Sequence, residues 1–522
     1  MIRLTLAPMT TPVKQADILL TTLNARYTHS AIGLRYLLAN MGELQASSDI
    51  REFTINDNIQ DIAEQLLAAR PKIIGIGIYI WNAVACVELL TTLKQVSPET
   101  IIILGGPEVS HAPIRIHVGA ADFIIQGEGD LAFGELCKVI LDGLAPRQQI
   151  IRAPLPDVSA IKLPYDLYTD EDVANRQIYV EASRGCPFLC EFCLSSIDEK
   201  VRNFNVEIVL QHLERLWQRG VRSFKFIDRT FNLNVKIASQ LLDFFLAKCQ
   251  SESCFVHFEV IPDHFPDALK ERISKFPPAS LQLEIGIQTL NMEVAKHIHR
   301  NLKLDKIEQN IRFLEHETAA HMHLDLIVGL PGESLESFGD NLNKLCAMTG
   351  SEIQIGILKK LSGTSLARHD DPFAMIYADQ PPYDILKNRL LSFEDIQAMK
   401  RFARFWDRFY NSGNFKQCLP LLWPDGDVFK AFHAFSLWIY AQTRSTWKIS
   451  LERLAQMLFN YLIEQGHHPD ELSQIMLADI MKLEGRKIPN FLKPYAHASP
   501  HIRPEISGKR AATFNKRQVR HG

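Results

Sequence analysis

The chain has 522 residues, which is more than one hydrophobic core usually serves, so we expect two or three domains. With 46% hydrophobic residues and a formal net charge of -3, the composition suits packed globular structure and excludes an overall cationic field that attracts nucleic acid or membranes. Residues 1–15 lack the apolar core of a secretory signal, and no apolar run approaches the roughly 20 residues of a membrane span, so a cytoplasmic protein is expected.

The first 144 residues alternate short apolar runs with amphipathic stretches. The predicted strands are Ile18–Leu23, Ile50–Ile55, Ile73–Ile78, Ile101–Leu104 and Phe123–Ile125. The predicted helices are Ile32–Met41, Asp57–Ala69, Ala83–Val96 and Asp130–Leu144. This alternation predicts an α/β domain with a doubly wound parallel sheet of the Rossmann or flavodoxin-like kind. Ligands of such sheets bind beyond the carboxyl ends of the strands, so the loops 24–30, 79–82, 105–110 and 126–130 should form one rim.

Residues 145–177 are rich in proline and charge, show no clear period and are predicted to be a linker. A second α/β alternation follows over residues 178–385. Its main predicted strands are Phe224–Ile227, Cys254–Val260, Leu281–Ile287, His321–Leu326 and Glu352–Leu358. We expect a partial or complete (β/α) barrel with its site at the carboxyl ends of the strands.

Residues 386–506 are predicted to form a helical C-terminal domain. Ser392, with Asp395 three residues later, is typical of a helix start. The aromatic residues that follow, such as Phe402, Trp406 and Phe435, recur at spacings of three and four, which favours a helical core over a ligand site. Residues 507–522 hold five Lys or Arg and are expected to be a disordered basic tail.

Three of the nine cysteines, Cys186, Cys190 and Cys193, fall within eight residues, in a loop punctuated by Gly185 and Pro187. Three thiolates bind three irons of a cubane and leave the fourth iron open, whereas a cluster that only carries electrons normally has four protein ligands. A zinc site or incidental cysteines are the alternatives, although no second CxxC or HxxxH pair lies nearby. A disulfide framework is not expected in a chain of this size.

The spacing Cys186-x3-Cys190-x2-Cys193, with Phe192 before the last cysteine, resembles the signature of the radical S-adenosylmethionine (SAM) superfamily. The resemblance implies a [4Fe-4S] cluster whose open iron binds SAM, and an electron from the cluster that cleaves SAM to a 5'-deoxyadenosyl radical. It also implies a small-molecule substrate and a reductase such as flavodoxin or ferredoxin as partners. Nucleic acid and membrane are not expected partners.

Later segments fall where that superfamily has cofactor-binding and catalytic residues. Asp228, at the end of a predicted strand, would contact the methionyl amine of SAM, although a carboxylate there also serves as a helix cap. The residues expected to contact ribose, methionine and adenine are Gly286, Gln288, Thr289, Gly329, Leu330 and Pro331. Glu259, on another strand, would either face the reaction chamber or belong to a surface ion pair.

The N-terminal domain resembles the cobalamin-binding domain that precedes many radical SAM cores. The resemblance rests on three glycine-containing segments in order, 74–82, 103–108 and 122–130, which span the third, fourth and fifth predicted strands and the loops after them. The residues that it implies in cobalamin binding are Tyr27, His29, Tyr79, Trp81, Asn82, Gly105, Gly106, Pro107, Gly127 and Glu128. No Asp-x-His-x-x-Gly loop follows the first strand, so the lower face of cobalamin is left to water or another side chain. His29 lies in the equivalent loop, either as a ligand or as a polar contact.

The order of the three parts resembles an uncharacterised branch of the cobalamin-binding radical SAM proteins. It implies a radical reaction at an unactivated carbon, with methyl transfer, rearrangement and ring formation all open. A non-catalytic cobalamin or redox sensor with a partner-binding C-terminal domain is a further alternative. Transfer-RNA methylthiolation is disfavoured, because the N-terminal domain holds only Cys86 and Cys137 where that family has three cysteines for a second cluster.

Overall fold

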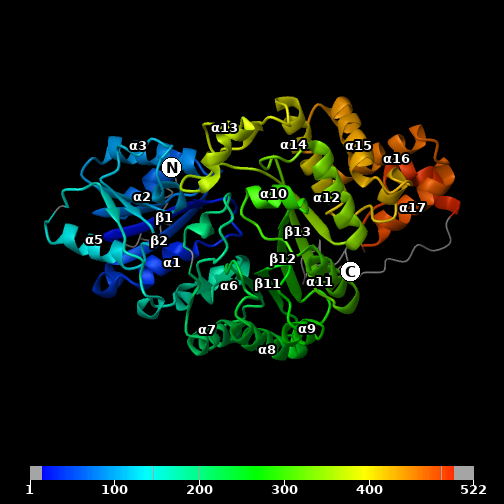
Figure 1. Cartoon of the computed structure of the whole chain (residues 1–522). Coiled ribbons are helices and arrows are strands. Elements are labelled where there is room, and N and C mark those ends of the chain that lie inside the picture. The colour runs from blue at the N-terminus through cyan, green and yellow to red at the C-terminus, as the bar shows by residue number, and fades with distance from the viewer. Residues whose placement is uncertain (1–14, 145, 199, 484, 499–522) are drawn as a thin grey trace, which may run out of the picture. The chain divides into compact units, whose positions relative to one another are not determined.

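The structure is a computed structural model that describes residues 15–144, 146–198, 200–483 and 485–498 (Figure 1). The predicted basic tail, residues 507–522, lies outside the described residues. The chain divides into two compact units. The first unit holds the described residues up to 182, together with 202–221 and 379–382, and the second unit holds 183–201, 222–378 and 383 onward. No helix among the described residues is long and apolar enough to cross a membrane.

The first unit contains a parallel sheet of six strands in the order β2-β1-β3-β4-β5-β6. The strands are β1 (Ile18–Asn24), β2 (Ser48–Thr54), β3 (Ile73–Gly77), β4 (Ile101–Gly105), β5 (Phe123–Gln126) and β6 (Ile150–Arg152). The direction in which strands are added reverses between β1 and β3, which is the switch point where flavodoxin-like sheets bind ligands. The five predicted strands are present, and β6 adds a short sixth strand within residues 145–177, where none is predicted.

Helices cover both faces of this sheet, so the predicted doubly wound fold is confirmed. Side chains alternate between the faces of a strand. Ile18 and Leu20 therefore pack with α1 and α5, whereas Leu19 and Leu23 pack with α2 and α3. The elements of this unit besides the six strands are α1 (Ile32–Ala39), α2 (Ile59–Leu67), α3 (Ala83–Val96), α4 (Pro107–Ser110), α5 (Ala132–Leu141), α6 (Asp170–Asn175), β7 (Ile178–Val180), β9 (Arg202–Asn203) and α7 (Val206–Gln218).

The second unit contains five parallel strands whose spatial order follows the chain. They are β10 (Ser223–Phe226), β11 (Phe255–Val260), β12 (Leu281–Gln288), β13 (His321–Val328) and β14 (Glu352–Ile357). Each crossover adds the next strand on the same side, as in an arc of a (β/α) barrel, which confirms the predicted partial barrel. All five carboxyl ends consequently lie along one edge of the sheet.

The connections in the second unit are mostly helical. Its helices and short strands are β8 (Ser183–Arg184), α8 (Val235–Ser251), α9 (Asp267–Ile273), α10 (Met292–His297), α11 (Leu304–Glu317), α12 (Leu335–Met348), α13 (Asp370–Phe373), β15 (Ile376–Tyr377), β16 (Ile385–Lys387), α14 (Phe393–Phe409), α15 (Val428–Thr443), α16 (Leu451–Glu464) and α17 (Pro469–Met481). Cys249, in the last turn of α8, and Cys254, directly before β11, form a disulfide. The signature cysteines are all free thiols.

Side chains at the end of helix α14 and directly after it hydrogen-bond to the outer edge of β14. The predicted start is confirmed, since Ser392 and Asp395 form a capping box. Near the other end of the helix, Trp406 Nε1 donates to the carbonyl oxygen of Ile353 at 2.9 Å, and Asn411 exchanges two hydrogen bonds of 2.9 Å with the backbone of Ile353. An edge strand leaves backbone groups unpaired, and these side chains supply the partners. Phe402 and Trp406 are completely buried, as predicted for a helical core.

Gly106 provides a test of the turn between β4 and α4. Its φ is 100°, and a Cβ at this position would lie 2.4 Å from the carbonyl oxygen of Ile78. We expect Gly106→Ala to lower the free energy of unfolding by about 2 kcal/mol or more, because left-handed strain and a backbone clash add up. Gly105→Ala is the matched control, since nothing lies within 4 Å of a Cβ there. Urea unfolding of the cobalamin-free protein, followed by circular dichroism, should separate the two variants, and equal losses would contradict the prediction.

Candidate functional site

The three signature cysteines line one cavity of about 290 Å³ in the second unit, which we call the chamber. The chamber wall is made by the cysteine loop, by the strands β11 to β13, by the segment after β10 and by the turn after α10. Polar residues that line it include Arg229, Glu259, Glu284, Gln288, Arg300 and Asp325. These residues are distant in sequence, and they meet because the parallel strands end at the same edge.

Burial and a nearby guanidinium act in opposite directions on the thiols of the cysteine loop. Burial raises the pKa of Cys186 and of Cys190, and at Cys190 the Arg300 guanidinium opposes this rise. Arg300 Nη1 donates to Cys190 Sγ at 3.6 Å, and its Nη2 donates to the carbonyl oxygen of Gly286 at 2.7 Å. Arg300 therefore connects the cysteine loop to β12 and stabilises negative charge on one sulfur.

The residues of this loop fit a cluster better than a single metal ion. In the part of the chain that the structure describes, no three Cys, His, Asp or Glu side chains are placed to hold one ion. Structural zinc needs four ligands at about 2.0–2.3 Å from one point, whereas each thiolate of a cubane binds a different iron. Three free thiols that share a chamber without converging on one point match the second case.

Glu259 lines the chamber and is also held in an ion pair. Arg229 Nη1 lies 3.0 Å from both carboxylate oxygens of Glu259, and this carboxylate is the main cause that raises the pKa of Arg229. The two alternatives drawn from the sequence, a chamber residue and an ion pair, therefore describe the same side chain. A catalytic role of Glu259 stays a prediction.

Two further carboxylates, Glu284 and Asp325, line the chamber on β12 and β13. Burial alone would raise the pKa of Glu284, but His257, whose Nε2 lies 2.9 Å away, and Lys225 lower it to about 2. Burial, with the charges of Glu284 and Glu259, instead raises the pKa of Asp325 well above its usual value. The buried Oδ1 of Asp325 has no hydrogen-bond partner among the described residues. This environment favours the protonated form of Asp325, and in that form the side chain can donate a hydrogen bond to a ligand.

Glu284 and Asp325 were not predicted as site residues, although the sequence contains a pattern that indicates them. On β12 the less buried positions are Gln282, Glu284, Gly286 and Gln288, and on β13 they are His321, His323, Asp325 and Ile327. Polar residues at every second position of a strand lie on one face. Two neighbouring strands with this alternation indicate a polar face that a ligand can reach.

Gly286 and Gln288 lie in the chamber wall as predicted. The register of β12 against β13 shifts between them, and Gln288 adopts a φ of 70°. Its side chain crosses over Gly286, where a Cβ would lie 2.7 Å from Gln288 Nε2. A bulge of this kind orients a side chain in a direction that a regular strand does not allow. Strained residues of this kind are common at functional sites.

The other predicted SAM-binding residues are not among those that line the chamber. Asp228 is buried and accepts a hydrogen bond of 2.6 Å from Ser183 Oγ. Thr289 is buried and donates to Glu333 at 2.7 Å, while Asn341 Nδ2 donates to both. Gly329, Leu330 and Pro331 form the turn after β13, in which Leu330 is completely buried. Direct contacts from these residues to SAM stay predictions.

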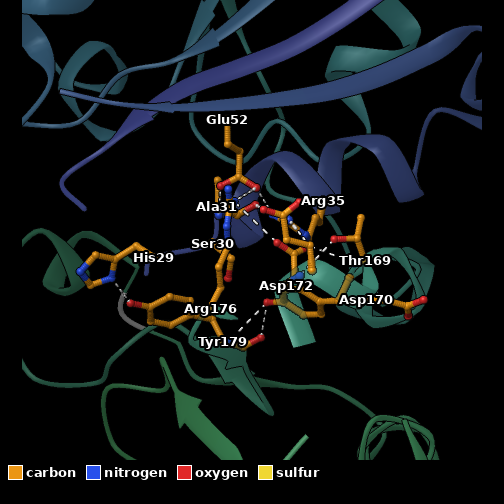
Figure 2. Close-up of polar contacts among 12 residues, drawn as sticks. His29, Ser30, Ala31, Arg35, Glu52, Thr169, Asp170, Asp172, Arg176 and Tyr179 are labelled. Carbon is orange, nitrogen blue, oxygen red and sulfur yellow. Dashed lines mark hydrogen bonds and ion pairs between the residues drawn. The ribbon is translucent and has the colours of Figure 1, made fainter. Parts of the chain in front are cut away.

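In the first unit, the loop after β1 is tied to the segment that includes α6 and β7 (Figure 2). His29 Nδ1 lies 2.5 Å from Tyr179 Oη, so His29 makes a polar contact within the protein. Behind the loop, the buried Arg35 pairs with Glu52 at 2.6 Å and with Asp172 at 2.7 Å. This network of buried charges fixes the loop in which the predicted cobalamin residues Tyr27 and His29 lie. Ligation of cobalamin by His29 stays a prediction.

The other predicted cobalamin-binding residues follow β3, β4 and β5. Trp81 is 48% exposed and stacks on Tyr79 with ring centroids 4.5 Å apart. Asn82 is buried and bridges to β1, with hydrogen bonds of 3.0 Å to Thr22 Oγ1 and to the carbonyl oxygen of Leu23. The remaining predicted residues are Gly105, Gly106 and Pro107 at the start of α4, and Gly127 and Glu128 directly after β5. Glu128 pairs with Arg202.

Comparison with known proteins identifies three segments of the chain. A family model described as B12 binding domain matches residues 18–137, and one described as Radical SAM superfamily matches residues 180–345. A third, described as a protein of unknown function (DUF4080), matches residues 371–512. The prediction of a cobalamin-binding domain before a radical SAM core is confirmed.

Curated relatives match over part of their length. An uncharacterized methyltransferase of Pyrococcus horikoshii is 28% identical over 238 residues, which are 40% of this chain and 51% of the relative. The cobalamin-dependent radical SAM methyltransferase TokK of Streptomyces tokunonensis is 25% identical over 340 residues, which are 58% of this chain and 49% of TokK. The chain thus spans about half the length of these relatives.

Solved structures share the fold. The cobalamin-dependent SAM radical enzyme OxsB, with aqua-cobalamin and SAM bound, aligns with a TM-score of 0.62 at 13% identity, over 93% of this chain and 84% of OxsB. The radical SAM methyltransferase TsrM from Kitasatospora setae, with cobalamin and a [4Fe-4S] cluster bound, aligns with a TM-score of 0.54 at 15% identity, over 67% of this chain and 77% of TsrM. At these identities the likeness concerns the fold.

Glu333 gives a prediction on the pH dependence of stability. Burial raises its pKa to about 8, against the lowering effect of the hydrogen bonds with Thr289 and Asn341. In the unfolded chain a glutamate titrates near about 4.3, so between this pH and about 8 only the unfolded state loses the proton. The contribution of Glu333 to stability is therefore largest at low pH and falls as pH rises, by at most about 1.4 kcal/mol per unit.

We expect Glu333→Gln, which keeps an uncharged side chain at all pH values, to gain thermal stability over the wild type as pH rises from about 6 to about 8.5. Glu336→Gln, at an exposed position in the first turn of α12, is the control and should show no such trend. Melting curves at both pH values measure the difference. If the difference in melting temperature between Glu333→Gln and the wild type is the same at both pH values, Glu333 is already ionised at the lower pH.

Proposed function

We propose that this chain, in which a B12-binding domain precedes a radical SAM core, methylates an unactivated carbon of a small molecule. It would bind a [4Fe-4S] cluster, SAM and cobalamin. The observation that carries the proposal is the meeting of Cys186, Cys190 and Cys193 with the polar strand ends in one chamber. Methyltransferases among the partial-length relatives favour methyl transfer over rearrangement as the outcome.

The cysteine loop is the proposed cluster site. Three thiolates leave one iron for SAM, and reductive cleavage of SAM to a 5'-deoxyadenosyl radical is the chemistry that the bound cluster supplies. Arg300 stabilises negative charge on Cys190 Sγ. Phe188 and Phe192 lie in the same wall and help to keep water from the reacting atoms. An electron donor such as flavodoxin or ferredoxin in the cytoplasm is the proposed partner.

The chamber offers a substrate two different polar groups. Arg229 is held by Glu259 and presents a fixed charged pair at one wall. Asp325 lies on β13 with its buried Oδ1 unpartnered among the described residues and, when protonated, donates a hydrogen bond. Fixed polar groups of this kind orient a small molecule so that one carbon faces the radical source.

The rim of the first unit is the proposed cobalamin site, and methyl donation is the chemistry that bound cobalamin supplies there. Gly106 lies directly against the backbone of Ile78, and no atom lies within 4 Å of a Cβ at Gly105, so the start of α4 leaves room for a large ligand. The exposed Trp81, backed by Tyr79, offers a flat apolar surface at the end of β3. We propose residues 1–144 as this domain, 145–177 as a linker, 178–385 as the radical SAM core and 386–506 as the C-terminal domain.

Cys190→Ala tests the cluster assignment. After anaerobic reconstitution we expect about four irons per chain in the wild type and loss of both iron and SAM cleavage in the variant. Iron assay and detection of 5'-deoxyadenosine measure the two. Cys137→Ala, which removes a buried thiol in the first unit, is the control and should keep both. Normal iron and SAM cleavage in Cys190→Ala would refute the assignment, and cleavage without any methylated product would favour a different radical reaction.

Trp81→Ala tests the cobalamin assignment. Loss of an aromatic contact worth about 1–1.5 kcal/mol should weaken hydroxocobalamin binding about tenfold, measured by absorbance titration. Trp447→Ala, which truncates a 65% exposed tryptophan in the C-terminal helical region, should leave the affinity unchanged. Equal affinity in both variants would place cobalamin elsewhere.

A further inference from the structure

Glu191 is a buried carboxylate inside the cysteine signature, between Cys190 and Cys193. Its side chain is only 1% exposed, and its backbone N–H donates to the carbonyl oxygen of Ile298 at 3.3 Å. A buried charge costs several kcal/mol unless it is paired and hydrogen-bonded. A carboxylate at this position must therefore have a compensating set of partners, and their placement shows what the loop is attached to.

Three side chains from two other segments surround Glu191. His369, which ends the 3-10 helix η5 (Ser365–His369) and is 6% exposed, places Nε2 at 2.6 Å from Glu191 Oε2. His299 Nδ1 lies 3.2 Å from Glu191 Oε1, and Arg368 forms an ion pair with the same oxygen. Arg368 also lies 3.0 Å from His299 Nε2. The cysteine loop is thus bound to the turn after α10 and to the segment 365–373.

The last residue of α10 and the segment 365–373 also contact the turn after β13. His297 Nδ1 lies 2.9 Å from the carbonyl oxygen of Pro331, and its ring packs on Phe373 at 4.8 Å and on His369 at 6.4 Å. Gly332, with a φ of 83°, has no room for a side chain, because a Cβ would lie 2.8 Å from the His297 ring and 3.1 Å from Phe373. One continuous set of contacts therefore runs from Glu191 to Pro331 and Gly332.

We propose that Glu191, His369, His297 and Phe373 form a strut that sets the distance between the cysteine loop and the turn Gly329–Gly332, and that Glu191 and His369 are positioning residues for SAM. The proposal rests on the proposed function, in which the cluster binds one end of SAM, and on the prediction from the sequence resemblance that this turn contacts the other end. A ligand held at both ends binds well only when the distance is fixed beforehand. Segment 365–373 supplies this constraint without itself touching the ligand.

Two variants test the strut, and each removes a side chain near one of its two ends. His369→Ala removes one of the three partners of Glu191, and Phe373→Ala removes the packing on His297, away from the cysteines. We expect both variants to keep the iron content of the wild type after reconstitution and to bind SAM about tenfold more weakly or worse, because a charged hydrogen bond or the packing of a half-buried ring is lost. His369→Gln, which keeps a donor near Glu191, should recover most of the affinity. His316→Ala, at an exposed position in α11, is the matched control.

Three readouts on the full chain separate the strut from a merely structural role: iron per chain, the dissociation constant of SAM, and the change in the electron paramagnetic resonance spectrum of the reduced cluster when SAM is added. Full iron, weakened SAM binding, a diminished spectral change and rescue by Gln support the strut. SAM affinity equal to wild type in Phe373→Ala overturns it. Iron loss in both His369 variants also overturns it, since the contact then only holds the loop. A wild type that binds no cluster refutes the proposed function instead.

Discussion

The carboxyl ends of β10 to β13 must lie along one edge of the sheet, because these strands are parallel and neighbours in chain order are neighbours in space. Arg229, Glu259, Gln288 and Asp325 meet at the chamber for this reason, although each comes from a different strand or the segment after it. Because these four residues share one edge, a cysteine loop placed at that edge faces all of them. The other elements of the second unit hold these strand ends in position.

Buried polar groups near the edge serve two purposes. Asp228 accepts a hydrogen bond from Ser183, and Thr289, Glu333 and Asn341 hydrogen-bond to one another, so that segments distant in sequence are tied together. Hydrogen-bonded networks of this kind stiffen a core, since moving one member breaks its bonds to the others. Asp325 lies at the chamber, and its buried Oδ1 has no hydrogen-bond partner among the described residues. Rigid surroundings and one unsatisfied group are what a ligand site requires.

The strands of both sheets could be predicted from the sequence because buried parallel strands are short apolar runs separated by helices. β6 could not, since its three residues are mostly exposed. The cysteine loop was recognisable because its spacing is local. The position of Thr289 was not, because the bulge at Gly286–Gln288 changes which way the following residue faces, and the positive φ of Gln288 has no signature in the sequence. Contacts such as Glu191 with His369, 178 residues apart, depend on tertiary structure alone.

The closure of β14 by Trp406 and Asn411 bears on how the C-terminal region can be exchanged between related enzymes. A chimaera that replaces residues after β16 inherits an uncovered row of backbone donors and acceptors unless the incoming helix brings equivalent side chains. Without these side chains, β14 can pair with a strand of a neighbouring molecule. The hybrid would then form oligomers because of its exposed strand and not because of its activity. Recombination of the C-terminal region is therefore limited by the lateral border of this sheet as much as by the residues of the chamber.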